Sequence, residues 1–145
     1  MFFDIFKPKK PKNARERYEE MLGLIAEEKM TIQQFVDKNA KWPLYHTVPF
    51  IQTKEGKSCP NVMSYEENGT PYMPAFFSAD ALVRHYESNG LVPGIIVKND
   101  LEGMLRALDS EPHIRRWGVV IDPDDKEKAL AIPPLMRVRP KCLRD

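Results

Sequence analysis

Carboxylates gather where one strand-like stretch of the chain ends. Asp122, Asp124 and Asp125 surround Pro123, and Glu127 follows two residues later. Divalent cations such as Ca²⁺ prefer carboxylate oxygens, so this loop is a candidate cation site. It lacks the glycine and the twelfth-position glutamate of a calcium-binding loop. We therefore favour a proline-containing turn that caps a helix, with cation binding by Asp122, Asp124 and Asp125 as the alternative.

Other residues able to do chemistry are scattered along the chain. His46, His85 and His113 are not spaced as metal ligands, and we expect structural or surface roles for them. No serine lies in a G-x-S-x-G motif, Cys59 precedes a proline, and no glycine-rich phosphate loop is present. We expect no catalytic residue, no metal and no cofactor. The alternative is a site that folding assembles from His46, His85 and residues 122–127.

Several aromatic residues flank a predicted hairpin and form a candidate protein-binding surface. This predicted surface consists of Trp42, Tyr45, His46, Tyr72 and Phe77. Aromatic side chains are enriched among the residues that anchor protein interfaces. The competing interpretation is that these rings pack between the hairpin and a helix.

The charged residues are unevenly distributed, although the net charge is only +1. Residues 1–17 hold six Lys and Arg against two acids, residues 137–145 hold four against one, and acidic residues dominate between them. Basic ends can contact nucleic acid or anionic lipid. The nearly neutral total favours solvated ends instead, so we expect no nucleic-acid binding.

The composition predicts a cytoplasmic protein. Cys59 and Cys142 lack the spacing of a secreted disulfide scaffold and are expected to be free thiols. The longest apolar stretch, residues 91–97, is much shorter than the ~20 residues that span a bilayer, so no membrane insertion is expected. Residues 1–6 do not have the order of a secretory signal. They either enter a partner's groove or fold back over this domain.

A chain of 145 residues can bury one hydrophobic core. Its 13 prolines favour short elements over long helices. We predict a single α/β (α+β) domain with a mixed β-sheet and a β-hairpin packed by three to four helices. Residues 1–13 form a basic, proline- and lysine-rich segment, residues 14–138 the domain, and residues 139–145 a basic tail.

Four helices are predicted. Apolar residues at helical spacing indicate a helix over residues 14–29. Thr31 and Gln34 form a capping box for a short second helix. Ser78 caps a third helix that ends near Glu87, before a glycine. Asn99 or Asp100 caps the fourth.

The strand predictions rest on β-branched and aromatic residues. Residues 42–51 predict one edge strand, with Leu44, His46, Val48 and Phe50 on the same side. An Asn-Gly turn between residues 62–65 and 71–77 predicts the hairpin. Further strands are expected at residues 94–97, 117–121, 129–132 and 136–138.

Three segments resemble the SseB N-terminal domain family. The first is Gly69-Thr70-Pro71-Tyr72-Met73-Pro74-Ala75-Phe76-Phe77-Ser78 followed by Ala81-Leu82, and the others are residues 42–50 and Gly118-Val119-Val120-Ile121-Asp122-Pro123. Phe77 stands where the family often has Thr, and Asp122 where Asn is usual. The resemblance covers residues 14–135 and implies an α/β domain of bacterial origin, without an established active site to transfer.

The sequence therefore favours a non-enzymatic, SseB-like protein-interaction or regulatory module that binds an unidentified protein. One alternative is the metal-dependent or hydrolytic enzyme described above. Another is an immunity-type protein, because small acidic domains can cover the basic active site of a toxin.

Overall fold

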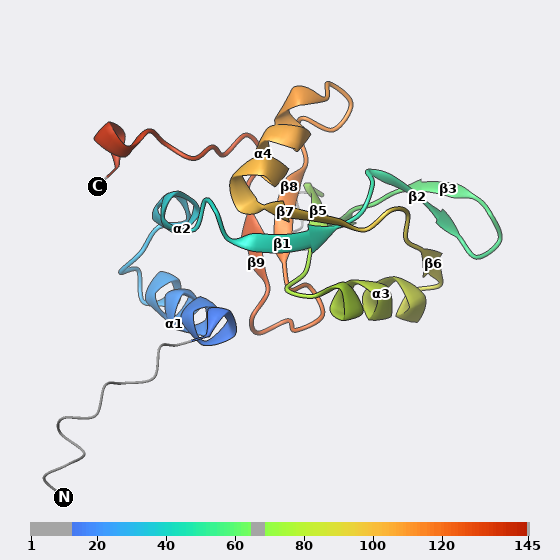
Figure 1. Cartoon of the computed structure of the whole chain (residues 1–145), viewed down its shortest axis with the longest axis horizontal. Coiled ribbons are helices and arrows are strands. Elements are labelled where there is room, and N and C mark those ends of the chain that lie inside the picture. Colours follow the sequence, from blue (N-terminus) through green and yellow to red (C-terminus); the bar gives the residue numbers. More distant parts are fainter. Residues whose placement is uncertain (1–12, 65–68, 145) are drawn as a thin grey trace, which may run out of the picture.

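Two parallel strands lie at the centre of the fold (Figure 1). β5 (Pro71–Ala75) pairs with β8 (Gly118–Ile121), and antiparallel neighbours, β4 (Met63–Ser64) and β9 (Leu130–Ile132), complete the four-stranded order β4-β5-β8-β9. This computed structural model describes residues 13–64 and 69–144. The predicted α+β class with a mixed sheet is confirmed, and so is the hairpin pairing of β4 with β5.

Two smaller sheets flank the central one. The first pairs β1 (Pro43–His46) with β7 (Val97–Asp100), and the second has the order β3-β2-β6, formed by β3 (Ser58–Pro60), β2 (Phe50–Thr53) and β6 (Leu91–Val92). Tyr45 and Phe76 exchange backbone hydrogen bonds of 2.8 and 2.9 Å, which join β1 to the end of β5.

The prediction of one edge strand over residues 42–51 is wrong. The chain leaves β1 after His46 and enters β2 at Phe50, in a different sheet. Between them the Thr47 hydroxyl donates to the carbonyl of Ile95, and Pro49 has no N–H for a ladder. The break also changes the facing of the side chains: His46 is buried, whereas Phe50 is 53% exposed.

Two other predicted strands differ from the structure. In place of a strand at residues 94–97, β6 ends at Val92 and β7 begins at Val97. The predicted strand at residues 136–138 is irregular backbone. The strands predicted at residues 117–121 and 129–132 match β8 and β9 closely.

Four helices lie in the described residues: α1 (Ala14–Ala26), α2 (Ile32–Lys38), α3 (Ala79–Ser88) and α4 (Leu101–Ser110). The capping box of Thr31 and the N-caps Ser78 and Asp100 are all formed, because each side chain accepts a backbone N–H of the first turn. α1 ends earlier than predicted, and Glu28 follows with φ +60°. None of these described helices is both long and apolar enough to cross a bilayer.

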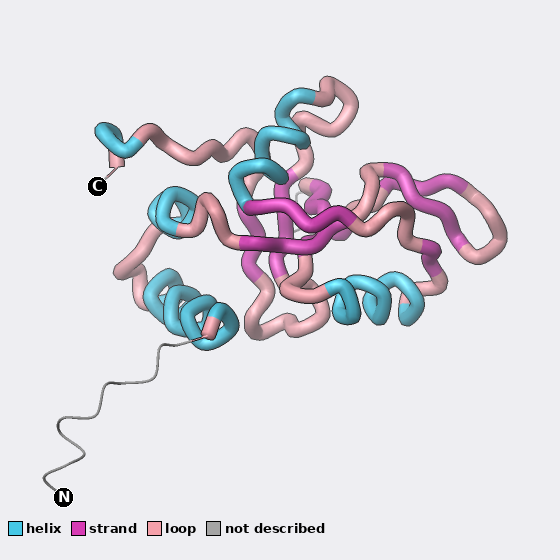
Figure 2. Tube along the Cα trace, viewed as in Figure 1, coloured by secondary structure: helices cyan, strands magenta, loops and turns pink. Residues whose placement is uncertain are grey.

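The helices lie in two groups around the strands, with α1, α2 and α4 in one core and α3 in another (Figure 2). In the first core, α1, α2 and α4 pack on Met73, Ala75, Val119 and Ile121. In the other, α3 packs on β2 and Phe76. β8 is buried along its whole length, as is typical of parallel strands.

The residues predicted as a solvated basic tail are partly docked. Arg139 donates from its backbone N and its Nε to the two carboxylate oxygens of Asp37, both at 2.7 Å. Arg137 forms a 2.5 Å ion pair with Asp109 of α4. Burial would raise the pKa of Asp37, but the hydrogen bonds from Arg139 outweigh it and hold that pKa below its ordinary value. The C-terminal segment therefore straps α4 and α2.

Gly118→Ala is expected to destabilise the protein by about 1–3 kcal/mol, the usual cost of overpacking a core. The new Cβ would lie 2.6 Å from the ring of Tyr72 and also against the carbonyl oxygen of Ile132. Neither group can easily move, because Tyr72 is buried and Ile132 belongs to β9. Urea unfolding measures the change.

Gly23→Ala is the matched control, because its Cβ would meet nothing within 4 Å. It lies inside α1, where alanine should stabilise by roughly 0.5–1 kcal/mol. Equal free energies of unfolding for the two variants would contradict the packing argument.

Candidate functional site

The acidic loop lies at the carboxyl ends of the parallel strands. Asp122 follows β8 directly, and its N–H donates to the carbonyl of Ala75 at the end of β5, at 2.9 Å. Ligand crevices of open α/β sheets form outside this edge. No helix follows within residues 123–129, so the predicted helix cap is wrong. The loop is instead a series of turns, in which Lys128 N donates to Asp125 O at 2.9 Å.

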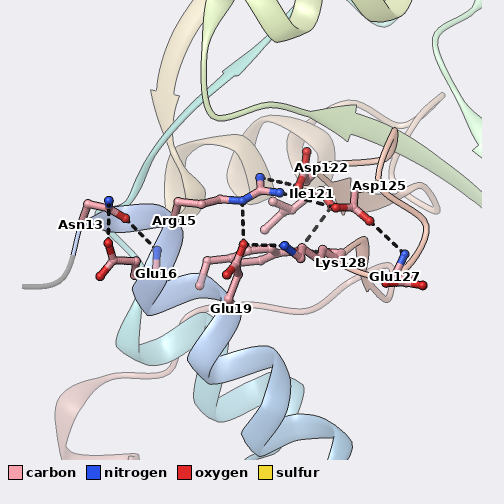
Figure 3. Close-up of polar contacts among 10 residues, drawn as sticks. Asn13, Arg15, Glu16, Glu19, Ile121, Asp122, Asp125, Glu127 and Lys128 are labelled. Atoms are coloured by element: carbon pink, nitrogen blue, oxygen red, sulfur yellow. Dashed lines mark hydrogen bonds and ion pairs between the residues drawn. The ribbon is translucent and has the colours of Figure 1, made fainter.

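Ion pairs join α1 to this loop in both directions, because Arg15 of α1 pairs with loop carboxylates and Lys128 of the loop pairs with Glu19 of α1 (Figure 3). Arg15 Nη1 lies 2.5 Å from Asp122 Oδ2, and its Nη2 lies 3.7 Å from Asp125 Oδ2. Glu19 accepts from Arg15 Nε at 3.3 Å and from Lys128 Nζ at 2.7 Å. Opposite charges thus alternate where α1 meets the loop, and these ion pairs attach the helix to the loop. We call this contact the α1–loop junction.

Burial sets the electrostatics of this junction. It raises the pKa of the Asp122 carboxyl, and the Arg15 guanidinium opposes that increase. It also raises the pKa of Tyr18, whose hydroxyl donates to the Lys128 carbonyl. Asp122 has φ +57°, a left-handed conformation that is uncommon outside glycine. The two ends of the loop are therefore attached to α1, through Asp122 and through the Lys128 carbonyl.

Folding brings His85 to the same loop. Its Nδ1 lies 2.6 Å from Asp124 Oδ1, and the imidazole is only 4% exposed between the rings of Phe76 and Tyr86. A carboxylate at Nδ1 favours the tautomer with its proton there, which leaves Nε2 as a proton acceptor. Among residues 13–64 and 69–144, no group of three potential metal ligands comes together.

The other histidines take different surroundings. His46 lies in β1 with Nδ1 hydrogen-bonded at 3.1 Å to the Thr47 carbonyl, and His113 is exposed after α4. The structure therefore pairs one histidine with one carboxylate of the loop, His85 with Asp124.

The aromatic residues predicted as a binding surface do not lie on one exposed patch. Tyr72 and His46 are buried. The rings of Trp42 and Phe77 pack around Tyr18, with centroids 5.6 and 4.9 Å from it. Tyr45 packs against the buried cluster that α3 forms with Ile51 and Phe76. A partner would reach only the exposed edges of Trp42, Tyr45 and Phe77.

A different apolar surface is exposed on the β3-β2-β6 sheet. Phe50 and Gln52 lie on one side of β2, and Val92 lies opposite Gln52 and therefore on the same side. Phe50 is 53% and Val92 47% exposed, whereas Ile51 on the reverse side is buried against α3. We call the exposed side, formed by Phe50, Gln52, Ser58, Pro60 and Val92, the β2 face.

The chain after β6 also exposes apolar side chains. Ile95 is 77% and Ile96 39% exposed, and the Ile95 carbonyl accepts from Thr47 between β1 and β2. The ring of Phe50 lies 5.9 Å from that of Trp117. Sequence reasoning missed this surface because it assigned Phe50 to the side of Leu44 and His46. The short turn at residues 54–57, between two brief strand-like runs, was the available signal.

In comparisons with protein-family models, with curated proteins and with solved structures, nothing matched this chain. The resemblance to the SseB N-terminal domain therefore stays a prediction.

Arg15→Met is expected to destabilise the protein by about 1–3 kcal/mol at neutral pH, because it leaves the half-buried Asp122 carboxylate without its cation. The raised pKa means that folded Asp122 keeps its proton to higher pH than in the unfolded chain. Its contribution to stability therefore falls as pH rises between those two pKa values. Loss of Arg15 raises the folded-state pKa of Asp122 further and so widens the pH range over which stability is lost. The difference in free energy of unfolding between wild type and Arg15→Met should therefore grow from about pH 4 to 7.

Urea unfolding over this pH range measures the deficit. Adding Asp122→Asn to Arg15→Met should remove its growth with pH. Arg106→Met is the matched control, because Arg106 forms an exposed pair with Glu102 in α4 at 3.5 Å. A deficit independent of pH would contradict this account of Asp122.

Proposed function

We propose that this chain is a non-enzymatic protein-interaction module that binds a partner protein through the β2 face. The observation that carries the proposal is the exposure of two large apolar side chains, Phe50 and Val92, on the same side of the paired strands β2 and β6. Single exposed apolar residues are common on protein surfaces. A contiguous exposed apolar surface is typical of an interaction site.

The β2 face has the properties of a preformed interface. α3 supports the sheet from behind through Ile51, so the face needs no folding step before it binds. Phe50 supplies an aromatic side chain of the type that anchors interfaces. The β2–β3 turn carries exposed Lys54 and Lys57 against one exposed acid, Glu55, and Arg116 is exposed next to Trp117. This excess of basic residues favours a partner whose apolar centre has an acidic rim.

Two other expectations belong to this proposal. The resemblance to the SseB N-terminal domain is compatible with it, because that family offers no active site to transfer. Cytoplasmic residence is compatible with Cys59 and Cys142, which are both free thiols. A regulatory or immunity-type role would use the same surface against one particular partner.

One observation favours a second candidate function. His85 and Asp124 form an imidazole–carboxylate pair of the kind that supplies a general base in hydrolases. No described Ser, Thr or Cys side chain is hydrogen-bonded to His85. A hydrolase panel with wild type, His85→Gln and Asp124→Asn tests this candidate. The hydrolase hypothesis is supported only if wild type shows an activity that both substitutions remove.

Phe50→Asp and Val92→Asp are each expected to weaken partner binding at least tenfold. Each places a charge in the apolar centre of the interface, where its desolvation opposes binding. Quantitative affinity capture from cell lysate first identifies proteins that wild type retains and both variants lose. Binding of the purified partner by calorimetry then measures the ratio of dissociation constants.

Leu143→Asp is the matched control, because Leu143 is similarly apolar and 63% exposed but lies in the C-terminal segment. It should bind the purified partner as wild type does. Retention of the same proteins by all four forms would argue against the β2 face, and so would equal dissociation constants for Phe50→Asp and Leu143→Asp.

A further inference from the structure

A groove lies between α1 and the chain that connects α2 to β1. It has a volume of about 660 Å³, and its apolar lining comes from Met21, Leu24, Trp42 and Pro43. This is within the range of about 300–1,000 Å³ typical of small-molecule sites. α1 and α2 lie at the opposite end of the molecule from β2 and β3 (Figure 1), so the groove is separate from the β2 face.

The floor of the groove is held rigidly. The indole of Trp42 packs against three other rings, with centroid distances of 5.6 Å to Tyr18, 5.9 Å to Phe35 and 5.3 Å to Phe77. Its backbone N donates to the Asn39 carbonyl at 3.0 Å. A ligand would therefore meet a preorganised apolar surface and lose little affinity to ordering of the protein.

Cations from three separate elements line the same groove. They are Arg17 from α1, Lys38 from the end of α2, and Lys41 from the turn before β1. Lys41 is 3.2 Å from Glu102, but among residues 13–64 and 69–144 no carboxylate pairs with Arg17 or Lys38. Among the described residues that line the groove, three are basic and one, Glu20, is acidic, so the groove has a positive balance of charge.

We propose that this groove binds a small amphipathic carboxylate, with an aliphatic or aromatic body on Leu24 and Trp42 and its carboxylate between Arg17 and Lys38. The guanidinium of Arg17 can donate two parallel hydrogen bonds to a carboxylate. Burial of the body against the indole supplies the apolar part of the binding free energy. The two unpartnered cations select an acid over a neutral molecule of the same shape. The inference is independent of the proposed function.

Decanoate is the probe, and 1-decanol is its uncharged counterpart of similar length. Trp117→Phe leaves Trp42 as the single tryptophan, so its fluorescence reports binding at the groove. We expect a saturable change with decanoate, below its micellar range, and at least tenfold weaker binding of 1-decanol. Calorimetry on the full chain with Trp117 intact confirms the stoichiometry of one.

Arg17→Gln with Lys38→Gln should weaken decanoate binding at least tenfold. Both side chains are exposed, so the fold should persist, and circular dichroism checks this. Lys54→Gln with Lys57→Gln is the matched control, because it removes the same charge at the β2–β3 turn and should leave binding unchanged. If the groove double variant fails to fold, decanoate protection of Lys38 from acetylation, read by mass spectrometry on wild type, decides instead.

Three outcomes would overturn the proposal. They are no saturable binding of decanoate, equal binding of decanoate and 1-decanol, and equal weakening by the two double variants. Partner capture through the β2 face should be the same for the groove double variant and for wild type, so failure of one site is distinguishable from failure of the other.

Discussion

The parallel pairing of β5 with β8 is the constraint on which the rest of the structure depends. Parallel strands cannot be joined by a tight turn, so the chain between them must leave the sheet and return along it. Residues 76–117 make this return, and on the way they build α3, β6, β7 and α4. α4 of this excursion packs with α1 and α2 on Met73, Ala75, Val119 and Ile121, and β8 is buried from end to end.

Two ion pairs and one imidazole–carboxylate hydrogen bond attach the peripheral segments to this centre. Arg15 of α1 partners Asp122 beyond β8, Arg139 of the C-terminal segment partners Asp37 of α2, and His85 of α3 partners Asp124. In the two ion pairs the carboxylates of Asp122 and Asp37 are largely buried, so an unpartnered charge would be costly there. Such pairs locate α1, the C-terminal strap and the acidic loop relative to the sheet. The three aspartates of the acidic loop therefore already have protein partners, which are Arg15 for Asp122 and Asp125 and His85 for Asp124.

The two surfaces proposed for recognition differ from the rest of the described structure in what they leave exposed: apolar side chains on one, and cations without a carboxylate on the other. On the β2 face, apolar side chains of a well-supported sheet remain exposed, which suits another protein. In the groove beside α1, two cations that no carboxylate of the described residues pairs with adjoin an indole fixed by its neighbours, which suits a small anion with an apolar body. The chemistry of the two differs, and they lie at opposite ends of the molecule. Binding at one therefore does not occlude the other.

Local interactions made much of the fold predictable from the sequence alone. The caps formed by Thr31, Ser78 and Asp100 need only the next three residues, and the hairpin of β4 and β5 needs only a short turn. Helical spacing and β-branched runs likewise depend on neighbours along the chain, so α1, α3, α4 and β8 were found from sequence. The α+β class follows from their order.

Only the tertiary structure decided which residues form the sites. Arg15 and Asp122, or His85 and Asp124, are far apart in sequence, and no local pattern encodes their meeting. The facing of Phe50 depends on a break at residues 47–49, where Thr47 bonds to Ile95 and the strand changes sheet. A change of one residue in register moves a side chain from the core to the surface. For that reason residue types and local periodicity determined the elements, and long-range pairing determined the exposed surfaces.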